Sequence, residues 1–377
     1  MAAEPGRRPL SVAIIGTRGV PPVYGGFETF AAELGARLAA RGHEVTVYCR
    51  ASLYRDEGSR WEGVRRIELP ALRHKYFETV SHSLLSVLDA FRRDFDAAIV
   101  CNAANAFVLP LLRVGRIPVA INVDGIERHR KKWNAFGRLV YMTGEAFSAH
   151  FADRVIADAE VIAEYYRRQF AIEPDILAYG SGFPDEEDSN ILSRLGLESR
   201  EYLLYVSRFE PENNPEAVVA AYAKVSGSRP LVMVGDAPYA GELIRRLERT
   251  SDRRILFPGA IYGQDYRTLQ RNALLYIQAT EVGGTHPALI EAMGSGGAVL
   301  ANDTPENREA GGSAVRYFRL GSDQNLTALL EESLDDPGAL DVYRTMARDR
   351  ARSTYDWSVV TDRYESLLAE LAAARVP

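Results

Sequence analysis

The chain has 377 residues, of which 46% are hydrophobic and 25% charged, and its formal net charge at pH 7 is −6. This length predicts two domains of a globular protein, and the acidic balance argues against general nucleic-acid binding. Two cysteines, Cys49 and Cys101, are too few for a disulfide framework. Each ends an apolar run, so both are expected to be buried free thiols.

The charge is unevenly distributed. Residues 1–182 carry 24 Lys and Arg against 21 Asp and Glu, whereas the remainder carries 21 against 30. The basic excess includes the clusters 65–76 and 128–133. A mildly basic half could face an anionic membrane or an anionic acceptor, and a solvated charged face is the alternative for each cluster.

The first ten residues, MAAEPGRRPL, lack the apolar core of a signal peptide. The most apolar stretch, 97–112, is interrupted by Asn102 and Asn105 and is too short to span a membrane. We therefore expect a cytoplasmic protein, with peripheral contact at the inner face of the cell membrane.

Strand-like and helical segments alternate along the first half of the chain. Buried strands are predicted at 11–16, 43–50, 97–102, 118–125 and 153–159, with helices at 27–41 and 134–151. The polar stretch 181–190 breaks this pattern. It then restarts with strands at 201–209, 230–237, 254–260, 273–279 and 297–303.

This alternation predicts an α/β fold with two doubly wound, Rossmann-like domains, covering 1–182 and 183–354. An amphipathic helix at 355–374 is expected to pack back on the first domain, so 355–377 forms a third segment. Because ligands bind at the carboxyl ends of parallel strands, two facing sheets would place the site in a cleft between the domains.

The most informative segment is EVGGTHPALIEAM, residues 281–293. It follows an apolar strand and contains a glycine turn, Pro287 at a first helical position, and a helix that carries Glu291. Such a helix start aims backbone N–H groups at a phosphate, and a carboxylate one turn later can accept hydrogen bonds from a sugar diol. The pattern indicates a nucleotide diphosphate pocket, with an ordinary strand–turn–helix as the alternative.

Other strand ends carry charged side chains. Arg208 lies just past EYLLYVS (201–207), and a guanidinium suits bidentate contact with a pyrophosphate. Asp124, Glu127 and Asp158 follow two other strands, where acids can act as general bases or position an acceptor hydroxyl. A surface salt bridge for the arginine and helix N-caps for the acids are the alternatives.

Several site classes are disfavoured. The first glycine-rich turn, 16–30, is not a G-x-G-x-x-G fingerprint, and the next strand ends in Arg50 instead of an acid, which argues against a dinucleotide-dependent oxidoreductase. That turn, with Gly25 and Gly26 at a helix start, is long enough to cover a bound ligand. No histidine pairs with a second ligand at metal-binding spacing, and Asp94 and Asp96 precede a strand, as in a solvated turn.

Six segments in this order resemble a GT-B glycosyltransferase of family 4, the retaining enzymes, and most of all the bacterial rhamnosyltransferase branch of β-1,4-rhamnosyltransferase type. They are IIGTRGVPPVYGGFET (14–29), NVDGIERHRKKW (122–133), ADRVIADA (152–159), AYGSG (178–182), SRFEPENN (207–214) and GGTHPALIEAM (283–293). The resemblance covers nearly the whole chain.

The resemblance implies that residues 1–182 bind the acceptor and residues 183–354 bind the nucleotide sugar. Glu291 matches a glutamate that holds ribose hydroxyls, and Arg208 matches a phosphate-binding arginine with a catalytic role. The implied donor contacts are Gly25, Gly26, Arg208, Asn213, Gly235, Gly284, Thr285, His286, Pro287 and Glu291. The implied acceptor-side or catalytic residues are Asp124, Glu127, Asp158 and Tyr179. The resemblance also implies a metal-independent enzyme without a cofactor.

Two positions depart from the broader family. Typical members have a glutamate where this chain has Gly283 and a lysine where it has Asn213. Both contacts would serve a hexose donor such as UDP-glucose, so their loss favours a 6-deoxysugar donor, dTDP-L-rhamnose. His286 stands where the rhamnosyltransferase branch more often has asparagine.

The expected activity is therefore rhamnosyl transfer to a hydroxyl of a lipid-pyrophosphate or polysaccharide acceptor in cell-surface glycan synthesis. A UDP- or GDP-sugar donor and a small-molecule acceptor remain alternatives. So do a nucleotide-sugar epimerase and a non-catalytic nucleotide-sugar binding protein. The sequence leaves the linkage, the oligomeric state and the choice between Asp124 and Asp158 open.

Overall fold

The computed structural model describes residues 8–23, 25–54, 58–72, 77–131, 133–182, 189–236, 241–321 and 325–374. The chain forms two compact units. Unit 1 contains residues 1–129, 133–179 and 357–377, and unit 2 contains residues 130–132 and 180–356. The predicted boundary at residue 183 lies in 183–188, outside the described residues.

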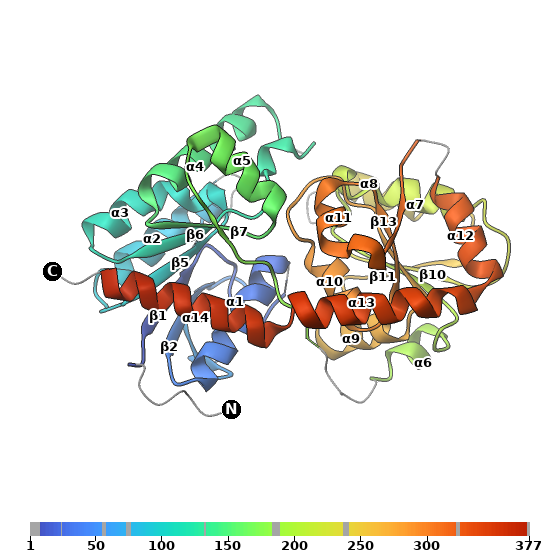
Figure 1. The fold of residues 1–377 in the computed structure, drawn as a ribbon, viewed down its shortest axis with the longest axis horizontal. Helices are drawn as coiled ribbons and strands as arrows, with labels where there is room; N and C mark the ends of the chain where they lie inside the picture. The colour runs from blue at the N-terminus through green and yellow to red at the C-terminus, as the bar shows by residue number, and fades with distance from the viewer. Residues whose placement is uncertain are drawn as a thin grey trace. The chain divides into compact units, whose positions relative to one another are not determined.

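Unit 1 is built on an eight-stranded sheet with the order β3-β4-β2-β1-β5-β6-β7-β8, parallel except for the β3–β4 pair. The strands are β1 Ser11–Ile15, β2 Glu44–Arg50, β3 Arg60–Trp61, β4 Val64–Leu69, β5 Ala97–Cys101, β6 Val119–Asn122, β7 Arg154–Ala157 and β8 Asp175–Ile176. The helices are α1 Gly26–Ala40, α2 Phe77–Ala90, α3 Leu109–Val114, α4 Ala135–Phe151, α5 Glu160–Phe170 and α14 Trp357–Ala374, with 3-10 turns η1 Ala103–Val108 and η2 Glu127–His129 (Figure 1).

Unit 2 is built on a six-stranded, all-parallel sheet with the order β11-β10-β9-β12-β13-β14. The strands are β9 Leu203–Val206, β10 Leu231–Val234, β11 Ile255–Gly259, β12 Leu275–Gln278, β13 Ala298–Asn302 and β14 Arg316–Phe318. The helices are α6 Ile191–Leu195, α7 Pro215–Tyr222, α8 Gly241–Leu247, α9 Gly263–Asn272, α10 Pro287–Gly294, α11 Pro305–Gly311, α12 Leu326–Asp335 and α13 Leu340–Thr354, with 3-10 turns η3 Pro211–Asn213, η4 Gly312–Ala314 and η5 Pro337–Ala339.

The predicted α/β fold with two Rossmann-like sheets is therefore confirmed. The central strands of both sheets are apolar runs that are covered on both faces, so their side chains are almost entirely buried. They are β1, β5 and β6 in unit 1, and β10, β12 and β13 in unit 2. Both cysteines are free and buried in unit 1, as expected.

The last helix, α14, belongs to unit 1, where it packs against α1 and β5. Its Tyr364 is fully buried, with its ring 5.1 Å from that of Phe30, and Asn122 donates a hydrogen bond of 3.2 Å to its hydroxyl. Glu365 accepts from Arg41 and lies 3.0 Å from His43. The chain thus leaves the first unit after Tyr179 and returns to it through α14, as the sequence predicted.

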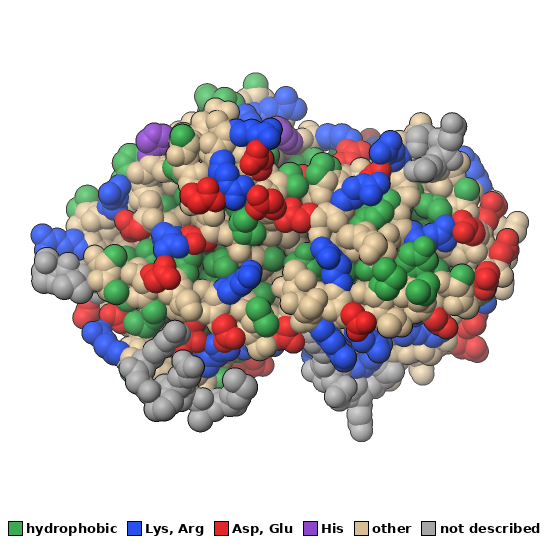
Figure 2. Space-filling model, viewed as in Figure 1, with side chains coloured by type: hydrophobic (Ala, Val, Ile, Leu, Met, Phe, Trp, Pro, Cys, Tyr) green, Lys and Arg blue, Asp and Glu red, His purple; other side chains and the backbone are tan. Residues whose placement is uncertain are grey.

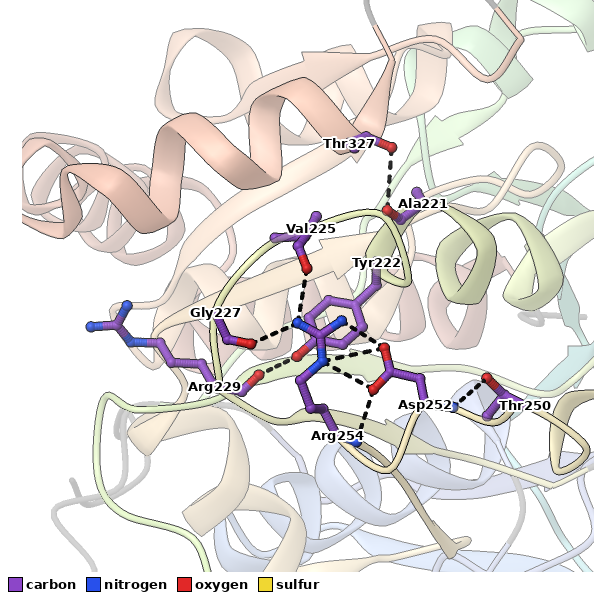
Figure 3. A network of polar contacts seen from close by, with 9 residues as sticks. All are labelled: Ala221, Tyr222, Val225, Gly227, Arg229, Thr250, Asp252, Arg254 and Thr327. Atoms are coloured by element: carbon purple, nitrogen blue, oxygen red, sulfur yellow. Dashed lines mark hydrogen bonds and ion pairs between the residues drawn. The ribbon is translucent and has the colours of Figure 1, made fainter.

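At one edge of the unit 2 sheet, Arg254 connects a turn to the sheet through hydrogen bonds (Figure 3). The guanidinium of Arg254 donates to the carbonyls of Val225 and Gly227, both at 2.8 Å, and pairs with Asp252 at 2.6 Å. It also lies over the ring of Tyr222, 4.8 Å from its centroid. This network stabilises the fold beside β10 and β11.

The buried His82 of α2 makes the stability of unit 1 depend on pH. The pKa of His82 is lowered to about 4, mainly by burial, with a smaller contribution from the positive charge of Arg50. An unfolded histidine titrates near 6.5, so the unfolded chain binds the extra proton first as the pH falls. This stability is complete above pH 6.5 and is lost as the pH falls towards 4.

We expect His82 to account for a loss of about 2 kcal/mol in unfolding free energy between pH 8 and pH 5. Urea unfolding across this range should give a flatter pH dependence for His82→Gln than for the wild type. The exposed His150 offers a control, since His150→Gln should keep the wild-type slope. Equal slopes for His82→Gln and the wild type would contradict the expectation.

Candidate active site

The strand order of unit 2 reverses between β9 and β12. From β9 the chain adds β10 and β11 on one side, and β12, β13 and β14 then follow on the other. Because β9 and β12 are parallel neighbours, the loops after them begin at the same edge of the sheet. Ligands of open α/β sheets bind at such switch points.

The loop after β9 presents Arg208. Its side chain is one-third exposed, and its Nη1 atom lies 3.9 Å from Oε1 of Glu210. Asn213 is nearly buried, and its amide donates a 2.6 Å hydrogen bond to the carbonyl of Arg208. Asn213 thus supports the loop that carries Arg208, and the direct donor contact predicted for it remains a prediction.

The loop after β12 leads into α10. Pro287 is at the first helical position and His286 caps the helix in an extended conformation. The imidazole of His286 covers Gly283, because a Cβ at position 283 would lie 2.4 Å from its Cε1 atom. Thr285, which lies between these two residues in the sequence, is also buried. The start of α10 carries the positive end of the helix dipole, which attracts anions.

Hydrogen bonds hold these two loops together. The backbone N–H of Glu281 donates to the carbonyl of Glu212 at 2.9 Å. The amide of Asn214 donates to the carbonyl of Ala279, also at 2.9 Å. Arg208 and the start of α10 therefore lie on two loops that are hydrogen-bonded to each other at the same edge of the unit 2 sheet.

Arg130 adds positive charge to this edge, a residue that the sequence did not single out. Its Nη1 atom lies 3.6 Å from Oε1 of Glu212 and 3.7 Å from Oε2 of Glu210. The pKa of His286 is lowered to about 3, mainly by burial and then by the positive charges of Arg130 and Arg208. At neutral pH, His286 is uncharged, and the positive charge comes from the two arginines.

Glu291, one turn into α10, is held by side chains of α9. The hydroxyl of Tyr266 donates to Oε2 of Glu291 at 2.5 Å. Gln270 in turn donates to the Tyr266 hydroxyl at 2.7 Å and to the carbonyl of Ala288 at 3.2 Å. Burial raises the pKa of Tyr266 well above its usual value, and Glu291 raises it further. The phenol therefore stays protonated and fixes the carboxylate by donation.

In unit 1, acids follow two neighbouring strands. Asp124 comes after β6 and Asp158 after β7, and these strands are parallel partners. Asp124 adopts a left-handed conformation, with φ of 56°, and its N–H donates to Oδ1 of Asn122 at 3.0 Å. Asp158 is almost fully buried. A non-glycine residue with such a φ is strained, which is common at functional sites.

Tyr179 lies within electrostatic reach of both acids. Its pKa is raised well above the usual value by burial first, and then by Asp124 and Asp158. Its ring packs edge-on against Phe27 and Phe30 of α1, at 6.2 and 5.9 Å between centroids. The phenol stays protonated at neutral pH, so it can donate a hydrogen bond but does not act as a base.

Two families of protein domain match the chain. Residues 25–179 match the family described as glycosyl transferase 4-like domain, and residues 189–353 match glycosyl transferases group 1. Together these matches cover most of both units. The chain belongs to the GT-B glycosyltransferases. No curated protein matches its sequence.

Solved structures of other proteins share this fold. Sucrose-phosphate synthase from Thermosynechococcus elongatus is similar with a TM-score of 0.82 and 20% identity, over 97% of this chain and 100% of that one. Anabaena HepE in complex with UDP-glucose gives 0.77 and 16%, over 96% and 100%. WaaG, a glycosyltransferase involved in lipopolysaccharide biosynthesis, gives 0.72 and 17%, over 95% and 99%. At these identities the likeness concerns the fold.

The remaining predicted site residues of this glycosyltransferase lie in a buried turn, at a helix start and at a close approach of two backbone segments. Glu127 is buried in η2. Gly25 and Gly26 begin α1, near Glu28, whose carboxylate accepts from the N–H of Arg18 at 2.8 Å. Gly235 has φ of 157°, and a Cβ there would lie 1.9 Å from the carbonyl oxygen of Ser207. Only glycine lets the end of β10 approach the loop that carries Arg208.

The described residues contain no group of three or more His, Cys, Asp or Glu side chains placed to hold a metal ion. Asp96, considered above as part of an Asp-x-Asp pair, accepts from the N–H of Ser11 at 2.8 Å and thus fixes the start of β1. Within the part of the chain that the structure describes, no helix is both long and apolar enough to cross a membrane.

Tyr266 offers a test of the Glu291 arrangement. We expect Tyr266→Phe to weaken the binding of dTDP roughly tenfold, since a hydrogen bond to a charged group contributes about 1.5–3 kcal/mol. Calorimetric titration with dTDP and with its 3′-deoxy analogue measures the effect. The loss should vanish with the analogue, which has no hydroxyl for Glu291.

The matched control is Tyr262→Phe, at an exposed tyrosine just before α9, which should bind dTDP as the wild type does. An equal loss of affinity for dTDP and its 3′-deoxy analogue in Tyr266→Phe would show a general structural effect and contradict the expectation.

Proposed function

We propose that the protein is a retaining glycosyltransferase that moves L-rhamnose from dTDP-β-L-rhamnose to a hydroxyl group of a lipid-linked or polysaccharide acceptor. Unit 2 would bind the donor through Arg208, the start of α10 and Glu291. Unit 1 would bind the acceptor near Asp124 and Asp158. Peripheral contact with an anionic membrane would bring the enzyme to a lipid-pyrophosphate acceptor.

The arrangement of Gly283 and His286 carries the donor proposal. Position 283 has no carboxylate, and the uncharged imidazole of His286 covers it. Glucose and mannose carry a hydroxyl at C6 that needs a polar partner, whereas L-rhamnose has a methyl group there and keeps its other hydroxyls. An uncharged ring without an adjacent carboxylate suits the methyl-bearing sugar better.

In the proposed reaction, the bond between the anomeric carbon and the diphosphate oxygen breaks, and the acceptor oxygen forms a new bond on the same face. Arg208 and the backbone amides at the start of α10 would stabilise the negative charge that builds on the leaving dTDP. The leaving phosphate oxygen would take the acceptor proton. Asp124 or Asp158 would orient the acceptor or stabilise positive charge on the sugar ring.

A donor panel tests this function. Release of nucleotide is measured from dTDP-L-rhamnose, UDP-glucose, UDP-N-acetylglucosamine and GDP-mannose, each with and without a lipid-pyrophosphate N-acetylglucosamine acceptor. We expect acceptor-dependent release from dTDP-L-rhamnose alone. Release from a hexose donor would overturn the donor assignment and leave the transferase intact. Epimerised sugar nucleotide without glycoside would favour an epimerase, and nucleotide binding without turnover on a wide acceptor set would favour a binding protein.

Position 283 gives a sharper test of the donor argument. A Cβ there would lie 2.4 Å from His286, so Gly283→Glu alone should displace the imidazole and reduce turnover with every donor. We expect Gly283→Glu combined with His286→Asn to relieve the clash and to shift the ratio of kcat/KM towards a hexose donor by about tenfold or more. An unchanged ratio in the double variant would show that these two residues do not determine the choice of donor.

A further inference from the structure

Large apolar side chains that face solvent are concentrated in unit 1, beginning on α2. The exposed fraction is 36% or more for four of them, and they follow one another at helical spacing along a single stripe: Leu84, Leu85, Leu88 and Phe91. The opposite side of the helix is buried, and Ser83 there donates to Asn105 of η1 at 2.6 Å. The stripe therefore points away from the core.

Helix α4 shows the same division. Its buried side contains Gly137, Tyr141, Gly144, Glu145 and Ser148, and Gly144 lies so close to η1 that a Cβ would be 2.3 Å from the carbonyl oxygen of Ala103. Its outward side carries four exposed apolar residues: Phe136, Leu139, Val140 and Met142.

Helix α3 and the turn η1 connect the two stripes. Both α2 and α4 pack against η1, and α3 continues directly from η1. Phe91 at the end of α2 lies against Gly115, and Val114 beside it is 81% exposed. We call the outward sides of these helices the α2–α3–α4 surface. Figure 2 shows hydrophobic side chains with basic ones among them along the margin of the molecule where α3 and α4 lie.

Exposed charges on this surface are mainly positive. Arg92, Arg113, Arg116 and Arg138 are exposed, and Asp94 is the exposed acid on the described residues of these helices and of the turns that follow α2 and α3. A surface cavity of about 390 Å³ lies at the ends of α2 and α3, lined by Phe91, Arg92, Arg93, Asp94, Gly115 and Ile117. Apolar side chains and arginines are thus interspersed.

Among the described residues of the two basic clusters noted in the sequence, several are engaged in ion pairs. Arg66 is buried and pairs with Glu68, and Lys131 pairs with Glu281 at 2.7 Å.

We propose that the α2–α3–α4 surface docks on an anionic phospholipid bilayer. Leucine, phenylalanine and methionine side chains would enter the boundary between headgroups and acyl chains, as on interfacial helices. The arginines would meet lipid phosphates, and long side chains such as Arg138 reach them while their stems stay in apolar surroundings. The surface extends the membrane contact of the proposed function and does not depend on the donor.

The test is flotation of the full-length protein with vesicles of phosphatidylcholine alone or mixed with phosphatidylglycerol. We expect binding to the mixed vesicles only. Leu139→Glu should lower the partition coefficient roughly tenfold, because it removes one inserted side chain and adds repulsion. Arg113→Glu should lower it about fivefold. Melting temperature and dTDP affinity, measured on each variant, show whether the fold and donor site are intact.

Matched controls lie on unit 2. Val342 and Leu139 have the same exposed fraction, 58%, so Val342→Glu should keep wild-type partitioning. Arg249→Glu is the corresponding control for charge. Equal partitioning of Leu139→Glu and the wild type, or wild-type binding to neutral vesicles as strong as to anionic ones, would overturn the proposal. So would a wild-type dimer in analytical ultracentrifugation that Leu139→Glu converts to a monomer. A failed donor panel with surface-dependent vesicle binding would affect only the proposed function.

Discussion

Arg208→Ala should lower the rate of sugar transfer by about 10²–10³-fold, the loss seen when one donor to a developing negative charge is removed. The side chain is one-third exposed at the carboxyl edge of β9, and its contact with Glu210 is long, at 3.9 Å. The guanidinium thus lies at the edge of the sheet where ligands of open α/β sheets bind. Because the charge on a leaving diphosphate grows towards the transition state, the effect should be larger on kcat than on nucleotide affinity.

Two further variants sharpen this expectation. Arg208→Lys keeps the charge but loses the planar fork, so it should recover only part of the rate. Arg229 is a matched control, since its side chain is 31% exposed and it precedes β10, at the amino edge of the same sheet. Arg229→Ala should transfer sugar at close to the wild-type rate. A wild-type rate for Arg208→Ala with each candidate donor would remove Arg208 from the active site.

The sequence predicted the central strands well because buried parallel strands are short apolar runs between turns. The edge strands were harder. Residues 64–69 form β4, but the sequence indicates only a basic cluster from residue 65 onwards. Arg66 is buried there, with its guanidinium over the ring of Tyr54, 5.2 Å from the centroid. A buried, paired arginine in a strand breaks the pattern that reveals the other strands.

The residues of the candidate site also differ in how clearly the sequence indicates them. Arg208, Asp124 and Asp158 stand out in the sequence because each follows an apolar strand, and their roles remain predictions. Tyr266 and Gln270 were missed, since their contact with Glu291 depends on how α9 packs against α10 and not on any local spacing. The i, i+4 separation of Tyr266 and Gln270 indicates a shared helix face, but nothing in the sequence says which helix that face meets.

Asp158→Asn should reduce sugar transfer by about 10²-fold or more and leave dTDP affinity unchanged. The residue belongs to unit 1, whereas Arg208 and Glu291 belong to unit 2. The substitution keeps the shape of this almost fully buried side chain and removes its charge. Titration with dTDP and initial rates at saturating donor separate the two effects.

The same measurements on Asp124→Asn decide which acid carries the chemistry. Asp124 holds a left-handed backbone conformation, which asparagine tolerates nearly as well as aspartate, so the variant should fold. If the catalytic acid is Asp158, Asp124→Asn should raise the KM for the acceptor with little change in kcat, and if the roles are exchanged the two variants should exchange behaviour. A loss of dTDP affinity in Asp158→Asn at an unchanged melting temperature would place this acid in donor binding, contrary to our assignment.

The titration of Tyr179 gives an independent sign that each charge has been removed. Because the carboxylates of Asp124 and Asp158 both raise the pKa of this tyrosine, its pKa should fall in both variants.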